Sequence, residues 1–142
     1  MKAVKKETHM MQLLIAYITT AIVFFGIDFI WLSKLAVNFY KREIGGLMLA
    51  KPNFVAAGIF YLFYIAGIVY FAVAPALRDG NAGEALLSGA IFGFLAYGTY
   101  DMTNLSTLKG WTWRLCVVDI IWGTVLTGGA AIAGFFLTQA FI

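Results

Sequence analysis

The chain has 142 residues, of which 62% are hydrophobic and 12% are charged, and its formal net charge is +3. This composition excludes an ordinary soluble domain, in which about half of the residues are apolar and about a quarter are charged. The single cysteine and the single histidine, His9 in the polar N-terminal segment, exclude an internal disulfide, a thiolate metal cluster, a bis-histidine haem and a Ser-His-Asp triad. The sequence also lacks GxGxxG, P-loop and HExxH motifs, so we predict no cofactor, no metal and no nucleic-acid partner.

Four stretches of the chain are almost free of charge, namely residues 10–33, 54–77, 85–108 and 115–142. Each meets or exceeds the ~20 residues that an α-helix needs to cross a hydrocarbon core. They are apolar on every side, whereas the strands of a membrane barrel alternate polar and apolar residues. The sequence therefore predicts an all-α fold, an integral membrane four-helix antiparallel bundle that contacts membrane lipids.

The chain begins with a basic leader, residues 1–10, and the rest, residues 11–142, is predicted to form one four-helix domain. The first helix is predicted at about residues 11–37. It is too long for the apolar core of a signal peptide, and it ends in Trp31 and Lys34 instead of a small-residue cleavage site, so we expect it to be retained.

The connection to the second helix carries three cations and two adjacent glycines, which is typical of an interfacial loop or a short amphipathic turn. The second helix is predicted at about residues 53–77, with Pro75 ending or bending its last turn. A tight glycine-rich link then makes the next helix, about residues 84–108, its antiparallel neighbour. Gly110 is the expected C-cap of that helix, and the last helix is predicted at about residues 112–137.

In an antiparallel chain, three aspartates from three helices emerge toward one side of the membrane. Asp28, Asp101 and Asp119 each lie about 8–12 Å along the helix axis from the nearest cation on that side. Asp101 continues a four-residue row from Gly89 and Gly93, and small residues follow Asp119 at similar spacing. Such rows mark helix contacts in membranes, so we expect these two carboxyls to face the bundle.

A carboxyl inside a membrane helix costs at least about 2.5–3.5 kcal/mol and indicates a functional site. None of the three aspartates has Lys or Arg three or four residues away, so its partner must come from another helix or from a ligand. The predicted pocket comprises Asp28, Trp31, Asn53, Tyr61, Tyr64, Tyr97, Tyr100, Asp101, Asn104, Lys109, Arg114, Asp119 and Trp122.

Structural interpretations stand beside this one. A buried aspartate bonded to hydroxyls fixes helix register, and glycine pairs serve packing. Trp111, Trp113 and Tyr40 are assigned to an aromatic belt at the membrane surface. Lys41 and Arg42 suit lipid headgroups, although a phosphate-bearing ligand would use the same groups.

Orientation follows from the cations near the ends of the helices. The loops on the aspartate side hold six of them, Lys34, Lys41, Arg42, Lys51, Lys109 and Arg114, against four on the other side. The positive-inside rule then predicts a cytoplasmic polar face, with both termini outside.

Several motifs resemble one family of bacterial membrane proteins. They are DFIWL (28–32), FYKREIG (39–45), KPN (51–53), the Tyr-rich start of the second helix (60–67), YDMTNLSTLKGW (100–111) and VDIIWG (118–123). The chain resembles the predicted membrane proteins classed as domain of unknown function 2177. The resemblance implies a small four-helix protein of the bacterial inner membrane, and it supplies no activity, cofactor or catalytic residue.

Three functions fit these observations. In the first, the pocket binds or processes a lipid-like or other amphipathic molecule, with Lys and Arg holding an anion and the carboxyls acting as acid, base or hydrogen-bond partners. In the second, the chain is a small proton- or cation-coupled transporter that acts as a homo-oligomer, because four helices enclose little pathway. In the third, it is an accessory or scaffold protein with structural aspartates. The sequence does not decide whether the protein is an enzyme.

Overall fold

The computed structural model describes residues 2–142, with side chains from residue 5 onward. Within this range the chain is helical and contains no strand. Its elements are α1 (Lys2–Ile30), the π-helix η1 (Trp31–Leu35), α2 (Val37–Ile44), the 3-10 helix η2 (Gly45–Leu47), α3 (Phe54–Ile68), the π-helix η3 (Val69–Val73), α4 (Ala74–Asp79), α5 (Ala82–Thr107) and α6 (Trp113–Phe141).

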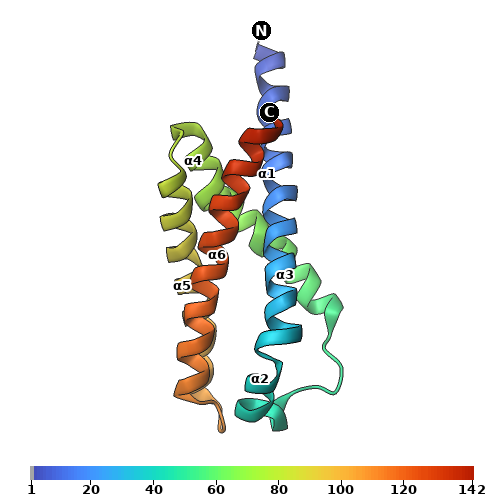
Figure 1. The fold of residues 1–142 in the computed structure, drawn as a ribbon, viewed down its shortest axis with the longest axis vertical. Coiled ribbons are helices and arrows are strands. Elements are labelled where there is room, and N and C mark those ends of the chain that lie inside the picture. The colour runs from blue at the N-terminus through green and yellow to red at the C-terminus, as the bar shows by residue number, and fades with distance from the viewer. Residues whose placement is uncertain (1) are drawn as a thin grey trace.

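The long helices run up and down side by side, and the predicted all-α membrane bundle is confirmed. Both termini lie at one end of the molecule together with the turn between α4 and α5 (Figure 1). The opposite end carries α2 and the turn between α5 and α6 (Figure 1). The ends of α1 and α5 and the starts of α3 and α6 therefore meet at the α2 end, the side on which the three aspartates lie.

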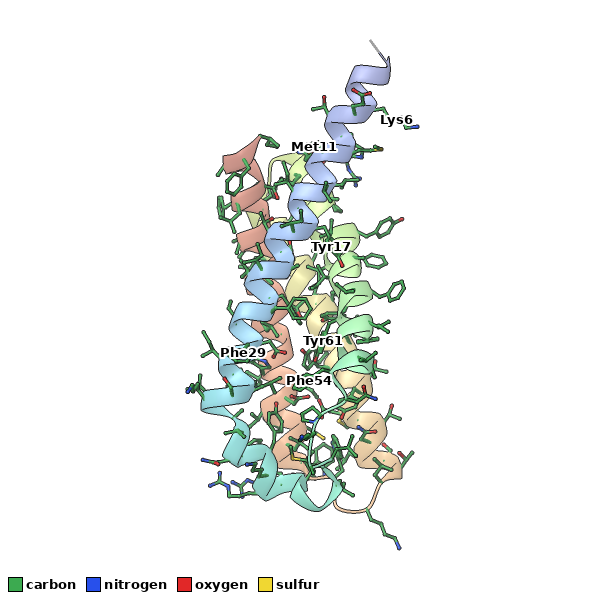
Figure 2. The ribbon with its side chains drawn as sticks, turned by 90° about the vertical axis from the view of Figure 1, so that its right-hand side faces the viewer. Lys6, Met11, Tyr17, Phe29, Phe54 and Tyr61 are labelled. Carbon is green, nitrogen blue, oxygen red and sulfur yellow. The ribbon has the colours of Figure 1, made fainter. Side chains whose placement is uncertain are left out.

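Three helical segments are long and apolar enough to cross a membrane, namely Lys5–Leu35, Phe54–Asp79 and Trp113–Phe141. The fourth long helix, α5, is not among them, because polar residues such as Thr99, Tyr100 and Asp101 interrupt its apolar stretch. It packs along α6, which covers its most polar side chain, Asp101. The outward faces of the bundle carry large hydrophobic side chains such as Phe29, which points away from the other helices (Figure 2).

The first and last helices extend beyond their predicted ends, because no helix-breaking residue stands there. α1 begins at Lys2, so the leader continues the first helix, and the turns around Lys6 extend beyond the other helices (Figures 1 and 2). α6 continues to Phe141. Pro75 does not end its helix. The π-helix η3 precedes it, and a widened turn accommodates a residue that has no N–H to donate. That helix ends at Gly80, which has the left-handed φ of 66°.

Small residues bring α5 and α6 into close contact. A Cβ added to Gly93 would meet the backbone oxygen of Gly123 and the side chain of Thr127, and one added to Gly123 would overlap the ring of Tyr97. The glycine spacing in the sequence therefore indicates this helix contact. The core above the aspartates is apolar and includes Phe24, Ile65 and Leu126.

Candidate functional site

A cavity of about 530 Å³ lies at the α2 end of the bundle. Its wall comes from α1, η1, α2, α3, α5, α6 and the loops after η2 and α5. The lining residues are Asp28, Trp31, Leu32, Tyr40, Ile44, Met48, Ala57, Phe60, Tyr61, Tyr64, Ala96, Tyr97, Tyr100, Asp101, Trp111, Leu115, Asp119 and Trp122. Carboxyl groups and aromatic rings dominate the list.

All three aspartates line this cavity and are buried. Asp101 is 0% exposed, Asp28 6% and Asp119 8%. Asp28 lies on α1, Asp101 on α5 and Asp119 on α6, and each side chain faces the cavity inside the bundle. Among residues 5–142, no three carboxyl, thiol or imidazole groups are close enough together to hold a metal ion. The three carboxyls thus do not form a cluster of metal ligands, although Asp119 interacts with both Asp101 and Asp28.

Asp28 is held by a tryptophan from the other end of the chain. The indole Nε1–H of Trp122 donates to Oδ1 of Asp28 at 3.1 Å. The same indole stacks on Trp31, with ring centroids 4.1 Å apart and an angle of 7° between the planes. Trp31 follows Asp28 by three residues at the start of η1, so one aromatic pair fixes the end of α1 against the start of α6.

Asp119 is held by α2. The hydroxyl of Tyr40 donates to Oδ1 of Asp119 at 2.5 Å and accepts from Nε1–H of Trp31 at 3.2 Å. Burial, and after it the charge and hydrogen bond of Asp119, raise the pKa of Tyr40 above its usual value, so the phenol remains a donor. Glu43, one turn further along α2, accepts from Oγ1 of Thr112 at 2.5 Å. α2 is therefore fastened to the start of α6 at two points.

Asp101 differs from the other two aspartates because neither of its carboxyl oxygens has a hydrogen-bond partner. The side chains of Asp119 and Trp111 interact with this carboxyl, but neither forms a hydrogen bond with its oxygens. The indole nitrogen of Trp111 is itself buried and unpartnered. A fully buried carboxyl without a partner is costly, and such groups in native proteins call for an explanation.

Aromatic side chains form most of the remaining wall. Tyr61 lies between α1 and α3 (Figure 2), and its ring contacts that of Tyr64. The hydroxyl of Tyr64 is 2.9 Å from Oγ1 of Thr127 on α6. Tyr97 packs against Tyr64, and Tyr100 meets Trp111 edge to face. The cavity thus has a polar, acidic part near α6 and an aromatic part near α3.

Comparison with family models decides the relationship suggested by the motifs. The model described as "Predicted membrane protein (DUF2177)" matches residues 13–136. The chain belongs to this family. Neither a curated protein nor a solved structure matched the chain. Membership in the DUF2177 family supports the membrane location and names no activity.

In this DUF2177 chain the structure brings nine of the thirteen predicted pocket residues to the cavity. They are Asp28, Trp31, Tyr61, Tyr64, Tyr97, Tyr100, Asp101, Asp119 and Trp122. Most of them share the face of their helix with an aspartate or with the glycine row. The helical period of the sequence therefore predicts that they lie at the cavity.

The other four predicted residues do not line the cavity. Asn53 is exposed and caps α3, accepting from the backbone N–H of Ala56 at 3.1 Å. Lys109 is exposed in the turn after α5, and Asn104 is absent from the lining. The side chain of Arg114 is 76% exposed and lies 3.9 Å from Glu43. Lys109 and Arg114 are exposed at the ends of α5 and α6, so these two cations lie near the site without entering it.

The sequence predicts an aromatic belt that includes Tyr40 and Trp111, but in the structure both line the cavity. The belt interpretation rests on the position of both residues outside the apolar stretches, and that position is correct. What it misses is that α2 folds back against α6 and that the turn before α6 directs Trp111 toward Asp101. The amphipathic pattern of residues 37–44 indicates a helix, but it does not say which neighbour the apolar face contacts.

Proposed function

We propose that this DUF2177 protein binds an amphipathic small molecule within the membrane, in the cavity at the α2 end. The polar group of the ligand lies among the carboxyls, and its apolar part lies against apolar lining side chains such as Leu32 and Phe60. The observation that carries the proposal is Asp101, a 0% exposed cavity residue whose two oxygens have no partner. A ligand that supplies a hydrogen-bond donor would satisfy it.

The size of the cavity supports this function. Small-molecule sites have volumes of about 300–1,000 Å³, with mostly apolar walls and a few polar groups that fix orientation. The cavity of about 530 Å³ falls in that range. Several lining residues are also exposed at the outer surface of the bundle, including Phe60 and Leu32. A ligand dissolved in the bilayer could enter between α1 and α3 without unfolding the bundle.

Binding is favoured over transport because the three carboxyl groups lie at one end of the bundle and only single hydroxyls are buried beyond them. Phe24, Ile65 and Leu126 are almost completely buried and lie in the apolar core beyond the cavity. The hydroxyl of Thr127 is buried within this layer, where it pairs with that of Tyr64, and Thr20 and Thr138 are buried beyond it. A proton or cation would have to cross the apolar layer, which supports a binding site that opens toward one end.

We further propose that the protein lies in the bacterial inner membrane with the cavity end in the cytoplasm and both termini outside. The excess of cations around α2 and the α5–α6 turn supports this orientation. In a Cys116→Ser background, Arg78→Cys should react with a membrane-impermeant maleimide in intact cells. Lys109→Cys should react only after lysis, and the reverse pattern would invert the orientation.

The binding function is tested by filling the cavity. Ala56 and Ala57 are both exposed, but only Ala57 lines the cavity. Protein purified in mild detergent is examined by native mass spectrometry for a co-purifying molecule. The unmodified chain and Ala56→Phe should carry the adduct, and Ala57→Phe should lose it while keeping its helix content. Absence of an adduct from the unmodified chain, or its equal retention in both variants, would contradict binding in this cavity.

A further inference from the structure

We infer that the polar group of the ligand is a cation, an amine or quaternary ammonium, held by Asp101 in the cavity that Asp28 and Asp119 also line. This inference rests on the proposed binding function and specifies the class of its ligand. It replaces the sequence-based hypothesis of an anion held by Lys and Arg, because those cations lie outside the cavity.

The charges that line the cavity are of one sign. Three lining residues are aspartates, and none is Lys, Arg or His. The nearest cations along the chain do not compensate them, since Lys109 and Arg114 are exposed and Arg114 instead faces Glu43. Coulomb interactions are strong where water is excluded, so a cavity of this kind repels a phosphate or sulfate and attracts a cation.

The hydrogen bonds leave the carboxyls incompletely satisfied. Asp28 and Asp119 each accept one bond from a neutral donor, Trp122 and Tyr40 respectively, and both use Oδ1. Asp101 accepts none. An ammonium group supplies donors and opposite charge together, whereas a neutral hydroxyl supplies only the donor. The ligand that matches the whole set is therefore positively charged.

The aromatic wall suits the same ligand. Tyr61, Tyr97 and Tyr100 and the indoles of Trp111 and Trp122 line the cavity beside the aspartates. The face of an aromatic ring attracts a cation within about 6 Å of its centroid, and cages of such rings bind quaternary ammonium groups. The alkyl part of the ligand finds Leu32, Phe60 and Met48 on the outer side of the cavity. The complete description is an amphiphile with a cationic head.

Three of the four tryptophans line the cavity, which provides a direct assay. Trp113 is exposed and is replaced by Phe. The probes are three single-chain amphiphiles with the same brominated alkyl chain, whose heads are trimethylammonium, hydroxyl and sulfate. Bromine quenches nearby indole fluorescence, and neutral maltoside micelles keep partition independent of head charge. We expect saturable quenching in which the ammonium probe binds about tenfold more tightly than the hydroxyl probe, with the sulfate probe weakest.

Asp101→Asn should bring the ammonium affinity down to that of the hydroxyl probe and leave the hydroxyl affinity unchanged. Asp79→Asn removes an exposed carboxylate from the distant α4 turn and should change neither. If Asp101→Asn does not fold, the inference is tested by the order of the three probe affinities on the unmodified chain and on Asp28→Asn. Equal binding of all three heads would overturn the cationic ligand and leave the binding function standing. No saturable quenching by any probe would overturn both.

The ammonium group has two sources, the zwitterionic head of a membrane lipid or a separate hydrophobic amine. Competition with an unbrominated ethanolamine phospholipid, compared with the same lipid carrying a glycerol head, distinguishes them. Displacement by the ethanolamine lipid alone identifies a lipid headgroup. Displacement by a single-chain alkylamine, with neither phospholipid effective, identifies a free amphiphilic amine. Either result supports a cationic ligand, and displacement by the glycerol lipid alone contradicts it.

Discussion

The hydroxyl of Tyr40 lies 2.5 Å from Oδ1 of Asp119 and 3.2 Å from the indole nitrogen of Trp31, so one phenol joins α2 to both η1 and α6. This contact places Tyr40 in the wall of the cavity. It also makes a short surface helix part of the wall of a site that lies within the bundle.

Tyr40→Phe removes both hydrogen bonds and keeps the ring. It leaves Asp119 without its donor, so we expect a loss of about 1–3 kcal/mol in the free energy of unfolding near neutral pH. Because folding raises the pKa of Tyr40, its contribution is fully present below the unfolded-state pKa of about 10 and declines as the pH rises further. Unfolding in SDS should show the difference between the two proteins narrowing above pH 10. A constant difference from pH 7 to pH 11 would contradict this account.

Trp122→Phe tests the other indole contact. The variant keeps an aromatic ring against Trp31 but removes the donor to Asp28, which is 6% exposed. We expect a loss of about 1–3 kcal/mol, because a buried acceptor is left unsatisfied. Trp113→Phe is the matched control, since Trp113 is 65% exposed and makes no such bond in the described structure. Thermal unfolding that ranks the two variants equally would show that the Asp28 contact contributes nothing.

Hydropathy and antiparallel connection are enough to predict which ends of the helices meet, because each apolar stretch must cross the bilayer. The shared end of Asp28, Asp101 and Asp119 follows from that alone. The sequence also repeats D-x-I-W at residues 28–31 and 119–122. In the structure the two tryptophans stack, and each helps to hold the aspartate of the other segment, Trp122 directly and Trp31 through Tyr40.

What the sequence does not determine is the direction of side chains outside the spanning helices. Tyr40, Trp111, Lys109 and Arg114 all lie within a few residues of a helix end, and a connection has no period that assigns them to a face. Their placement depends on how α2 folds against α6, where the half-buried side chains of Tyr40 and Ile44 line the cavity. For this reason the sequence predicts Lys109 and Arg114 in the pocket, whereas in the structure neither residue lines it.

The close contact of α5 and α6 predicts a steep cost for one methyl group. In Gly93→Ala the new Cβ would overlap the carbonyl oxygen of Gly123 and the side chain of Thr127, so the helices must separate. We expect a loss of about 1–3 kcal/mol. Gly98→Ala is the control on the same helix, since no atom lies within 4 Å of its added Cβ. It should be neutral or stabilising by about 0.5–1 kcal/mol. Equal SDS stability of the two variants would contradict the packing described for this helix pair.

Asn53→Ala separates a capping role from a role in the cavity. Asn53 accepts from the backbone N–H of Ala56 and is absent from the cavity lining, so the substitution should cost about 1 kcal/mol of stability. The co-purifying molecule and the quenching by the ammonium probe should both be retained, unlike in Ala57→Phe. Asn53→Asp keeps a capping oxygen and should restore most of the stability, because aspartate caps helices about as well as asparagine. If Asn53→Ala instead releases the ligand at unchanged stability, the cavity must extend to the start of α3, and the boundary of the site drawn at Ala57 is wrong.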